Sequence, residues 1–338
     1  MPVKFRMNNN LFMKDAFTPK PWMRNPHLQS ILGSIKKRSQ DRHPMIECAR
    51  EKIIDGGNGA RLLGFYSCHE SRNARGLVTL IHGWEGSADS AYILSTAQYL
   101  YDRRYDIFRL NLRDHGNSHH LNEGLFHGAL IDETFKSVHN ISRLSLELPY
   151  SVIGFSLGGN YALRIAKKHS LSKIDNLHNV IAISPALDPY KATVAIDESL
   201  PIYRYYFLNK WKNSLRKKQS LFPNRYDFNN IIQLKTCMAL TEAVMIHYPE
   251  FRTYREYFNQ YTLRGDFFTD LSVPVTIIAS EDDPIISVHD LYGLNNNKFL
   301  RLLIEKYGGH CGFINFPPLQ CWYEEKIEHI LCQSKETQ

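Results

Sequence analysis

Short apolar runs recur along the chain, and between them lie segments in which apolar residues are three or four positions apart. Apolar runs closed by glycine or polar residues are typical of strands buried on both faces of a sheet. They predict strands at residues 76–83, 105–112, 150–156, 179–186, 273–280 and 299–307. The spacing of three and four predicts helices at residues 90–103, 131–147, 160–170 and 322–331.

An additional pair of strands is predicted at residues 51–67, where the turn sequence "GGNG" separates two strand-like segments. The total is eight strands, most of them alternating with helices. Alternating strands and helices favour parallel strands joined by crossover helices. We therefore predict an α/β fold with a mostly parallel eight-stranded sheet and helices on both of its faces.

This alternation divides the chain into three parts. Residues 46–188 and 270–338 carry it and form the predicted core, whereas residues 189–269 interrupt it with aromatic and basic sequence such as "YRYYFLNKWKNSLRKK". A loop of that length without secondary structure would be unusual, so we predict a helical cap inserted over one end of the sheet. Residues 1–45 are punctuated by prolines and predict an irregular N-terminal extension that wraps the core.

Composition narrows the class of protein. Hydrophobic residues make up 43% of the chain and charged residues 22%, which suits a globular domain with a sizeable core. The net charge of +7 comes without a nucleic-acid-binding motif, so we expect no nucleic-acid partner. The six cysteines form no CxxC pair and predict neither a disulfide framework nor a zinc site. No apolar run has the length of a signal peptide core or a membrane span, so we expect a cytoplasmic protein.

The segment "GFSLGG" lies between a predicted strand and a predicted helix. Gly154, Ser156 and Gly158 match the G-x-S-x-G pattern of a nucleophile elbow, whose tight turn needs small flanking residues. Ser156 would then project from the carboxyl end of the sheet as a nucleophile. The alternative interpretation is a glycine-rich turn that binds a nucleotide or only packs.

A serine nucleophile needs a base that is oriented by an acid, and in this arrangement the chain order is serine, acid, histidine. Asp282 and Asp283 end one later predicted strand, and His310 ends the next, in a glycine-rich loop. We favour Asp283 over Asp282 because of the "PII" sequence that follows it. The alternatives are that the aspartates are turn or helix-capping residues and that His310 is an ordinary loop histidine.

The sequence "IHGWEGS" closes an earlier predicted strand. His82 and Gly83, followed by Trp84, match the loop that supplies a second donor to an oxyanion hole. We predict that the backbone N–H groups of Trp84 and Leu157 are these donors. The alternative is a plain glycine turn in which Trp84 is a packing residue.

Two other clusters invite a functional interpretation. Four histidines gather near "RDHGNSHH" but lack the carboxylates of a known metal site, so we favour a structural loop and expect no metal: His115, His119, His120 and His127. The predicted cap contains the basic and aromatic segment "LNKWKNSLRKKQ". That segment is an amphipathic candidate for peripheral contact with an anionic membrane surface, and a solvated face of the cap is the alternative that we favour.

The motifs "HGWEGS", "RDHGNS", "GFSLGGN", "SEDDPI" and "YGGHCGFI" resemble those of the YheT-like α/β-hydrolase fold enzymes (AB-hydrolase family 4). The upstream segment "NPHLQSIL" is similar to a signature of that group, and the resemblance covers residues 20 to 330 or so. It implies an α/β-hydrolase fold and a Ser156–Asp283–His310 triad. It also implies hydrolysis of short- to medium-chain carboxylesters, including monoacylglycerol- or phospholipid-like ones. Asp114 and His115 depart from the usual pair in "RDHGNS", and we expect no N-terminal membrane anchor of the kind found in animal relatives.

From these residues we predict a serine carboxylester hydrolase that acts on a small acyl ester and needs neither a cofactor nor an obligate protein partner. One alternative is an acyltransferase that uses the same triad and an alcohol in place of water. Another is a non-catalytic module that binds a membrane or a protein on the same fold.

Overall fold

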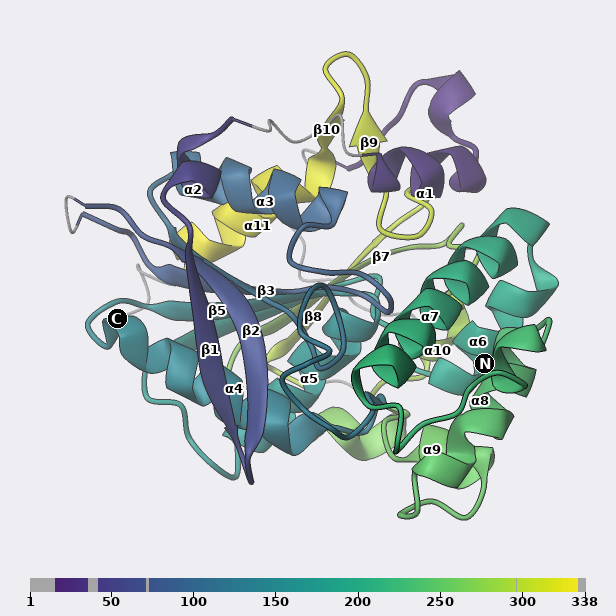
Figure 1. The fold of residues 1–338 in the computed structure, drawn as a ribbon. Coiled ribbons are helices and arrows are strands. Elements are labelled where there is room, and N and C mark those ends of the chain that lie inside the picture. The colour runs from purple at the N-terminus through teal and green to yellow at the C-terminus, as the bar shows by residue number, and fades with distance from the viewer. Residues whose placement is uncertain (1–15, 36–41, 71–72, 296, 334–338) are drawn as a thin grey trace.

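The computed structural model describes residues 16–35, 42–70, 73–295 and 297–333. In this described part of the chain, one eight-stranded sheet runs through the molecule in the order β1-β2-β4-β3-β5-β6-β7-β8 (Figure 1). β1 and β2 form an antiparallel hairpin, β2 pairs antiparallel with β4, and the remaining neighbours are parallel. The predicted fold class is confirmed.

Each strand of the sheet was predicted from an apolar run or from the hairpin signal. The strands are β1 (Arg50–Gly57), β2 (Ala60–Ser67), β3 (Leu77–Ile81), β4 (Asp106–Leu110), β5 (Tyr150–Phe155), β6 (Leu177–Ile183), β7 (Val275–Ser280) and β8 (Leu300–Glu305). A second, two-residue ladder of β9 (Ile314–Asn315) and β10 (Gln320–Cys321) was not predicted, because two residues are too short to show a periodic pattern.

Within the residues that the structure describes, helices alternate with the parallel strands of the core, whereas two helices precede the first strand and four follow one another within residues 189–269. They are α1 (Pro26–Ser34), α2 (Pro44–Glu47), α3 (Ala91–Asp102), α4 (Ile131–Ser142), α5 (Leu157–His169), α6 (Pro189–Glu198), α7 (Pro201–Leu221), α8 (Cys237–Val244), α9 (Tyr254–Asn259), α10 (Val288–Tyr292) and α11 (Trp322–Gln333). None of the helices in the described residues is long and apolar enough to cross a membrane.

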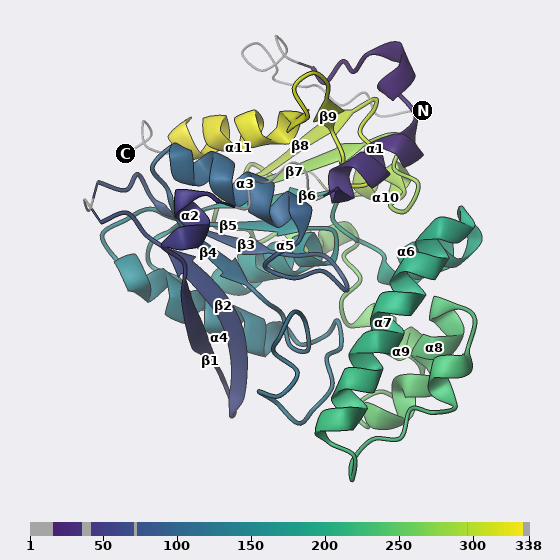
Figure 2. The same ribbon diagram turned by 45° about the horizontal axis from the view of Figure 1, so that its top comes forward.

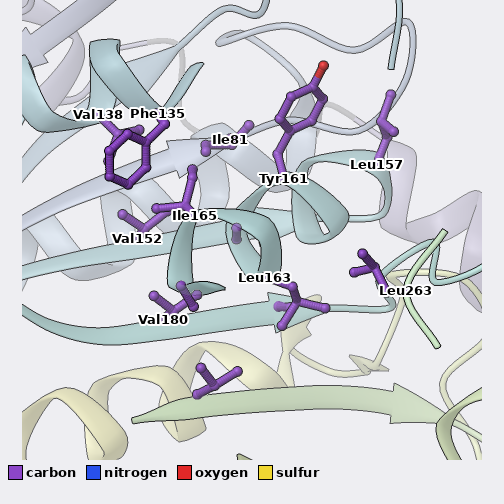
Figure 3. Packing of buried hydrophobic residues seen from close by; sticks show 14 of the residues in the cluster. Ile81, Phe135, Val138, Val152, Leu157, Tyr161, Leu163, Ile165, Val180 and Leu263 are labelled. Carbon is purple, nitrogen blue, oxygen red and sulfur yellow. The ribbon is translucent and has the colours of Figure 1, made fainter. Parts of the chain in front are cut away.

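Two hydrophobic layers hold the sheet between its helices. On one face, α4 and α5 pack against β3, β5 and β6, and Figure 3 shows Val138, Ile165 and Val152 among the side chains that meet there. On the other face, α3 and α11 cover the same strands, with Ile93 and Ile327 buried against them. Burying apolar area on both faces is what makes such short strands stable.

Residues 189–269 form α6, α7, α8 and α9, which gather on one side of the molecule (Figures 1 and 2). Their side chains make a third hydrophobic cluster, in which Leu208, Phe228 and Leu240 are buried. Ile285 and Ile286, which follow β7, belong to the same cluster, so these helices pack on the end of the sheet where the parallel strands finish.

The extension predicted for residues 1–45 is only partly described, because residues 1–15 and 36–41 lie outside the described residues. Its described part is not entirely irregular, since it contains the nine-residue helix α1. Asn25 caps this helix by accepting hydrogen bonds from the N–H groups of His27 and Leu28, and Pro26 occupies its first turn. Proline at that position favours a helix start, which is why its presence did not break the segment.

Candidate active site

Ser156 occupies the sharp turn between β5 and α5. Its backbone has a φ of 53° and a ψ of −114°, in the left-handed region that non-glycine residues rarely adopt. A side chain at Gly154 would run into the carbonyl group of Gly158, and one at Gly158 would run into the backbone of β3. The turn is therefore as tight as the G-x-S-x-G pattern predicts, and it holds Ser156 at the end of the sheet.

The three side chains of the predicted triad lie within hydrogen-bond distance of one another. Ser156 Oγ is 2.9 Å from His310 Nε2, and His310 Nδ1 is 2.8 Å from Asp283 Oδ2. The Asp283 side chain is 2% exposed, and its other oxygen accepts hydrogen bonds from the N–H groups of Ile285 and Ile286. A carboxylate that is held in this way can accept a hydrogen bond from Nδ1–H, which leaves Nε2 free to accept the serine proton.

Asp282 points to a different partner. Its carboxylate accepts a hydrogen bond of 2.9 Å from the N–H of Gly309, the residue before His310. Burial raises the pKa of Asp282, and the hydrogen bond from Gly309 opposes that shift. The two adjacent aspartates thus contact the histidine loop at different points: Asp283 at the ring and Asp282 at the backbone.

The backbone donors predicted for an oxyanion hole flank Ser156. Leu157 is the first residue of α5, where an N–H has no acceptor within its own helix. Within the described residues, the N–H of Trp84 has no hydrogen-bond acceptor, whereas the N–H of Gly83 donates to the hydroxyl of Tyr92. The Cα of Gly83 lies so close to the serine that a Cβ there would sit 3.2 Å from the Cβ of Ser156.

Two neutral histidines, His82 and His115, hold the loop that follows β3 and carries Trp84. His82 accepts a hydrogen bond from the N–H of Leu112 at Nε2, so its Nδ1–H donates to the Gly83 carbonyl. His115 accepts from the N–H of Glu85 in the same way. Burial lowers the pKa of His82 well below its ordinary value and that of His115 to about 4. Both side chains therefore act as fixed hydrogen-bond links between the loops that follow β3 and β4.

Helix α1 holds the loop that carries His310, which was not predicted. The N–H of His310 donates a 2.8 Å hydrogen bond to Ser30 Oγ. The fully buried amide of Gln29 accepts from the N–H of Ile314 and donates to its carbonyl group, and Gly33 packs against the backbone of the same loop. The motif "NPHLQS" was the available signal, but nothing in its own sequence identifies the partner.

The cap is tied to the core by a buried ion pair. Lys218 of α7 is 1% exposed and lies 2.7 Å from the carboxylate of Asp114, which is 5% exposed. The ammonium also donates hydrogen bonds to the carbonyl groups of His119, Asn122 and Gly124. Burial raises the pKa of Asp114 to about 6 and lowers that of Lys218, and each charge opposes the shift of the other.

The burial of Lys218 corrects one residue of our prediction that the segment "LNKWKNSLRKKQ" forms a solvated or membrane-contacting face. Lys218 is buried in the core contact and is therefore unable to meet a membrane surface. Lys210 and Lys217 also donate hydrogen bonds to core loops. The side chain of Trp84 joins the same contact, stacking 5.3 Å from Phe207 and lying edge-on to Trp211.

The histidines near "RDHGNSHH" do not converge on one point. His119 Nε2 is 2.8 Å from the hydroxyl of Ser214, and His127 Nε2 is 2.9 Å from a carboxylate oxygen of Glu250. No group of three or more potential metal ligands occurs among the residues that the structure describes.

A cavity opens beside Ser156, between the sheet and the cap. Ser156, Leu157 and His310 lie at one end of it, and the remaining lining is mostly apolar. Its walls include Trp211, Val244, Tyr248, Phe258 and Ile286. An apolar group bound there would therefore reach the Ser156 hydroxyl without leaving a low-polarity environment.

The chain is similar to a known protein family and to proteins with esterase and lipase names. A family model described as the alpha/beta hydrolase fold matches residues 76–317. "Putative esterase slr0264" of Synechocystis sp. is 23% identical over 295 residues, which cover 80% of this chain and 78% of that protein. "Monoacylglycerol lipase ABHD2" of Danio rerio is 23% identical over 351 residues, which cover 95% and 81%.

A similar architecture occurs among solved structures. The esterase Pf2001 of Pyrococcus furiosus superposes with a TM-score of 0.54 and 16% sequence identity, over 87% of this chain and 94% of that one. At such low identity, this similarity concerns the fold alone. It agrees with the sheet order and with the family match, and the predicted α/β-hydrolase fold is confirmed.

Proposed function

Because the chain belongs to the α/β hydrolase fold family, we propose that it is a serine hydrolase that cleaves carboxylesters through Ser156, His310 and Asp283. The observation that carries this proposal is the pair of distances, 2.9 Å and 2.8 Å, that links serine, imidazole and carboxylate in order. The esterase and lipase names of the relatives support it. The motif "NPHLQSIL" favours the YheT-like group within the family.

The reaction proceeds in two halves. Ser156 Oγ attacks the ester carbonyl carbon while its proton passes to His310 Nε2, and Asp283 stabilises the imidazolium that forms. The N–H groups of Trp84 and Leu157 bind the oxyanion of the tetrahedral intermediate. The C–O bond to the alcohol breaks, and His310 gives its proton to the leaving oxygen. A water molecule, deprotonated by the same imidazole, then attacks the acyl-enzyme and releases the acid.

The substrates that suit this site are lipid-like esters of short- to medium-chain acids, with monoacylglycerols as one class. The apolar cavity beneath the cap supplies room for an acyl chain next to Ser156. Each methylene of the acyl chain that moves from water into this aromatic and aliphatic lining should stabilise the bound ester by up to about 0.8 kcal/mol. We expect kcat/KM to rise with acyl length until the cavity is full.

A labelling and kinetic experiment tests the proposal. A fluorophosphonate probe should label the purified protein, and p-nitrophenyl esters of increasing acyl length should be hydrolysed. Ser156→Ala should abolish both, whereas Ser220→Ala, which alters an exposed serine of α7 that lines neither cavity, should retain both. Equal rates for Ser156→Ala and the unaltered protein would sink the assignment. Product analysis with added ethanol distinguishes hydrolysis from acyl transfer.

A further inference from the structure

A second cavity also reaches Ser156. It shares Ser156, His310, Trp84, Phe207 and Ile285 with the first cavity, but α1 and the first turns of α7 form its other walls in place of the inner cap helices. Its volume is about 320 Å³, against about 80 Å³ for the cavity beneath the cap. The scissile bond of an ester at Ser156 would therefore lie where two adjoining spaces meet.

Much of the lining of this second cavity is apolar. Ile31 of α1 and Ile202 of α7 supply aliphatic surface that the first cavity does not share. Ile31 and Ile202, which both line this cavity, are 40% and 53% exposed and so leave apolar surface open to a ligand. Tyr203 bridges the two walls, because its hydroxyl lies 3.1 Å from His27 Nδ1 of α1.

The chemistry of the triad indicates which part of an ester each cavity receives. The oxygen that leaves must lie next to His310 Nε2, because that nitrogen donates the proton to it. His310 lines both cavities, but its neighbour Cys311 lines only the second, and α1 packs directly on the loop that carries them. The first cavity is instead lined by Leu157, whose N–H binds the carbonyl oxygen of the acyl group in the proposed mechanism.

The geometry points to an alcohol subsite in the second cavity, built by α1 and α7, which takes a bulky apolar alcohol. This inference rests on the proposed esterase function and narrows its substrate class. Esters with an apolar alcohol and a short acyl chain fill both spaces, whereas a glycerol ester leaves the larger apolar space to a polar group. The unaltered protein should therefore prefer the former.

Two substrate series separate the two subsites. One holds the acyl group as acetate and lengthens the alcohol from methanol to hexanol; the other holds the alcohol as methanol and lengthens the acyl chain. Hydrolysis is followed by acid release at constant pH. In the unaltered protein, kcat/KM should rise along the alcohol series by up to about fourfold per methylene that is buried, and hexyl acetate should exceed glycerol monoacetate.

Variants that fill one cavity should change one series. Ile31→Trp and Ile202→Trp, on two different helices, should each reduce the gain along the alcohol series at least tenfold and leave the slope of the acyl series unchanged. Ala192→Leu, which lines the cavity beneath the cap, should do the reverse. Leu171→Trp is the matched control, because Leu171 is 85% exposed and lies outside both cavities.

The outcomes keep this inference apart from the proposed function. If the folded variants Ile31→Trp and Ile202→Trp reduce the gain in kcat/KM along the acyl series, or change neither series, the proposed alcohol subsite is wrong while the proposed ester hydrolysis stands. A preference of the unaltered protein for glycerol monoacetate over hexyl acetate would overturn the subsite as well. If Ser156→Ala hydrolyses both series as fast as the unaltered protein, it is the proposed function that fails.

Discussion

Replacing Lys218 with methionine tests the contact between cap and core most directly. Methionine keeps an unbranched apolar stem but removes the ammonium that lies 2.7 Å from Asp114. The carboxylate is then left buried without its partner, and three carbonyl groups lose a donor. Removing one member of a buried ion pair costs about 3–5 kcal/mol. We expect a loss of that size in the free energy of unfolding at pH 8.

The loss of unfolding free energy caused by Lys218→Met should be smaller at pH 5 than at pH 8. The pKa of Asp114 is raised from 3.8 to about 6, so the folded protein binds this proton more tightly than the unfolded chain does. Its contribution to stability is therefore full below about pH 4 and is lost as the pH rises through about 6. At pH 5 the carboxyl is mostly protonated with or without Lys218, and the substitution should cost only the lost hydrogen bonds, about 1–3 kcal/mol.

Urea unfolding of both proteins at pH 5 and pH 8, followed by tryptophan fluorescence, measures the two losses. Asp114→Asn combined with Lys218→Met is the control, because it removes the charge that would be stranded; its stability should vary less between the two pH values. A loss for Lys218→Met below about 1 kcal/mol at pH 8, or the same loss at both pH values, would refute the reasoning.

Three further predictions concern the nucleophile turn and the histidine loop. Asp283→Asn should lower kcat by about 10⁴-fold in steady-state assays, because an amide cannot hold the imidazole as a carboxylate does; a similar loss in Asp282→Asn would contradict the different contacts of the two residues. Gly154→Ala should lower the free energy of unfolding by more than about 3 kcal/mol, because its Cβ meets backbone, while Gly159→Ala, whose Cβ would lie 3.0 Å from a proline side chain, should lower it less; equal melting temperatures would be contrary evidence. Gln29→Leu should destabilise the protein by about 2–4 kcal/mol, because it strands three buried backbone partners, and kcat should fall with it; unchanged kinetics would mean that α1 does not position the loop.

The sheet was predictable because its signals are local. The strands β3, β5 and β7 are buried on both faces, so nearly every residue in each of them must be apolar or small. A few consecutive residues are enough to show that pattern. The approximate placement of Ser156 and His310 followed from the strand ends. Parallel strands finish at one edge of a sheet, so residues that follow them come together.

The contacts that the sequence did not reveal depend on partners far along the chain. Lys218 looks like a solvated residue of a basic helix, and only the position of Asp114, 104 residues earlier, decides that it is buried. Gln29 and Ser30 likewise meet the histidine loop across more than 270 positions. A pattern within one segment carries no information about which distant segment will cover it.

The hydrogen bond between Ser30 and His310 joins residues 280 positions apart, and this has a consequence for synthesis. Proteins emerge from the ribosome with the N-terminal part first, so α1 is made 280 residues before the loop that it holds. Until that loop arrives, a growing chain has its nucleophile turn but no anchored base. We therefore expect no ester cleavage by a growing chain before the loop that carries His310 has been made and has docked on α1.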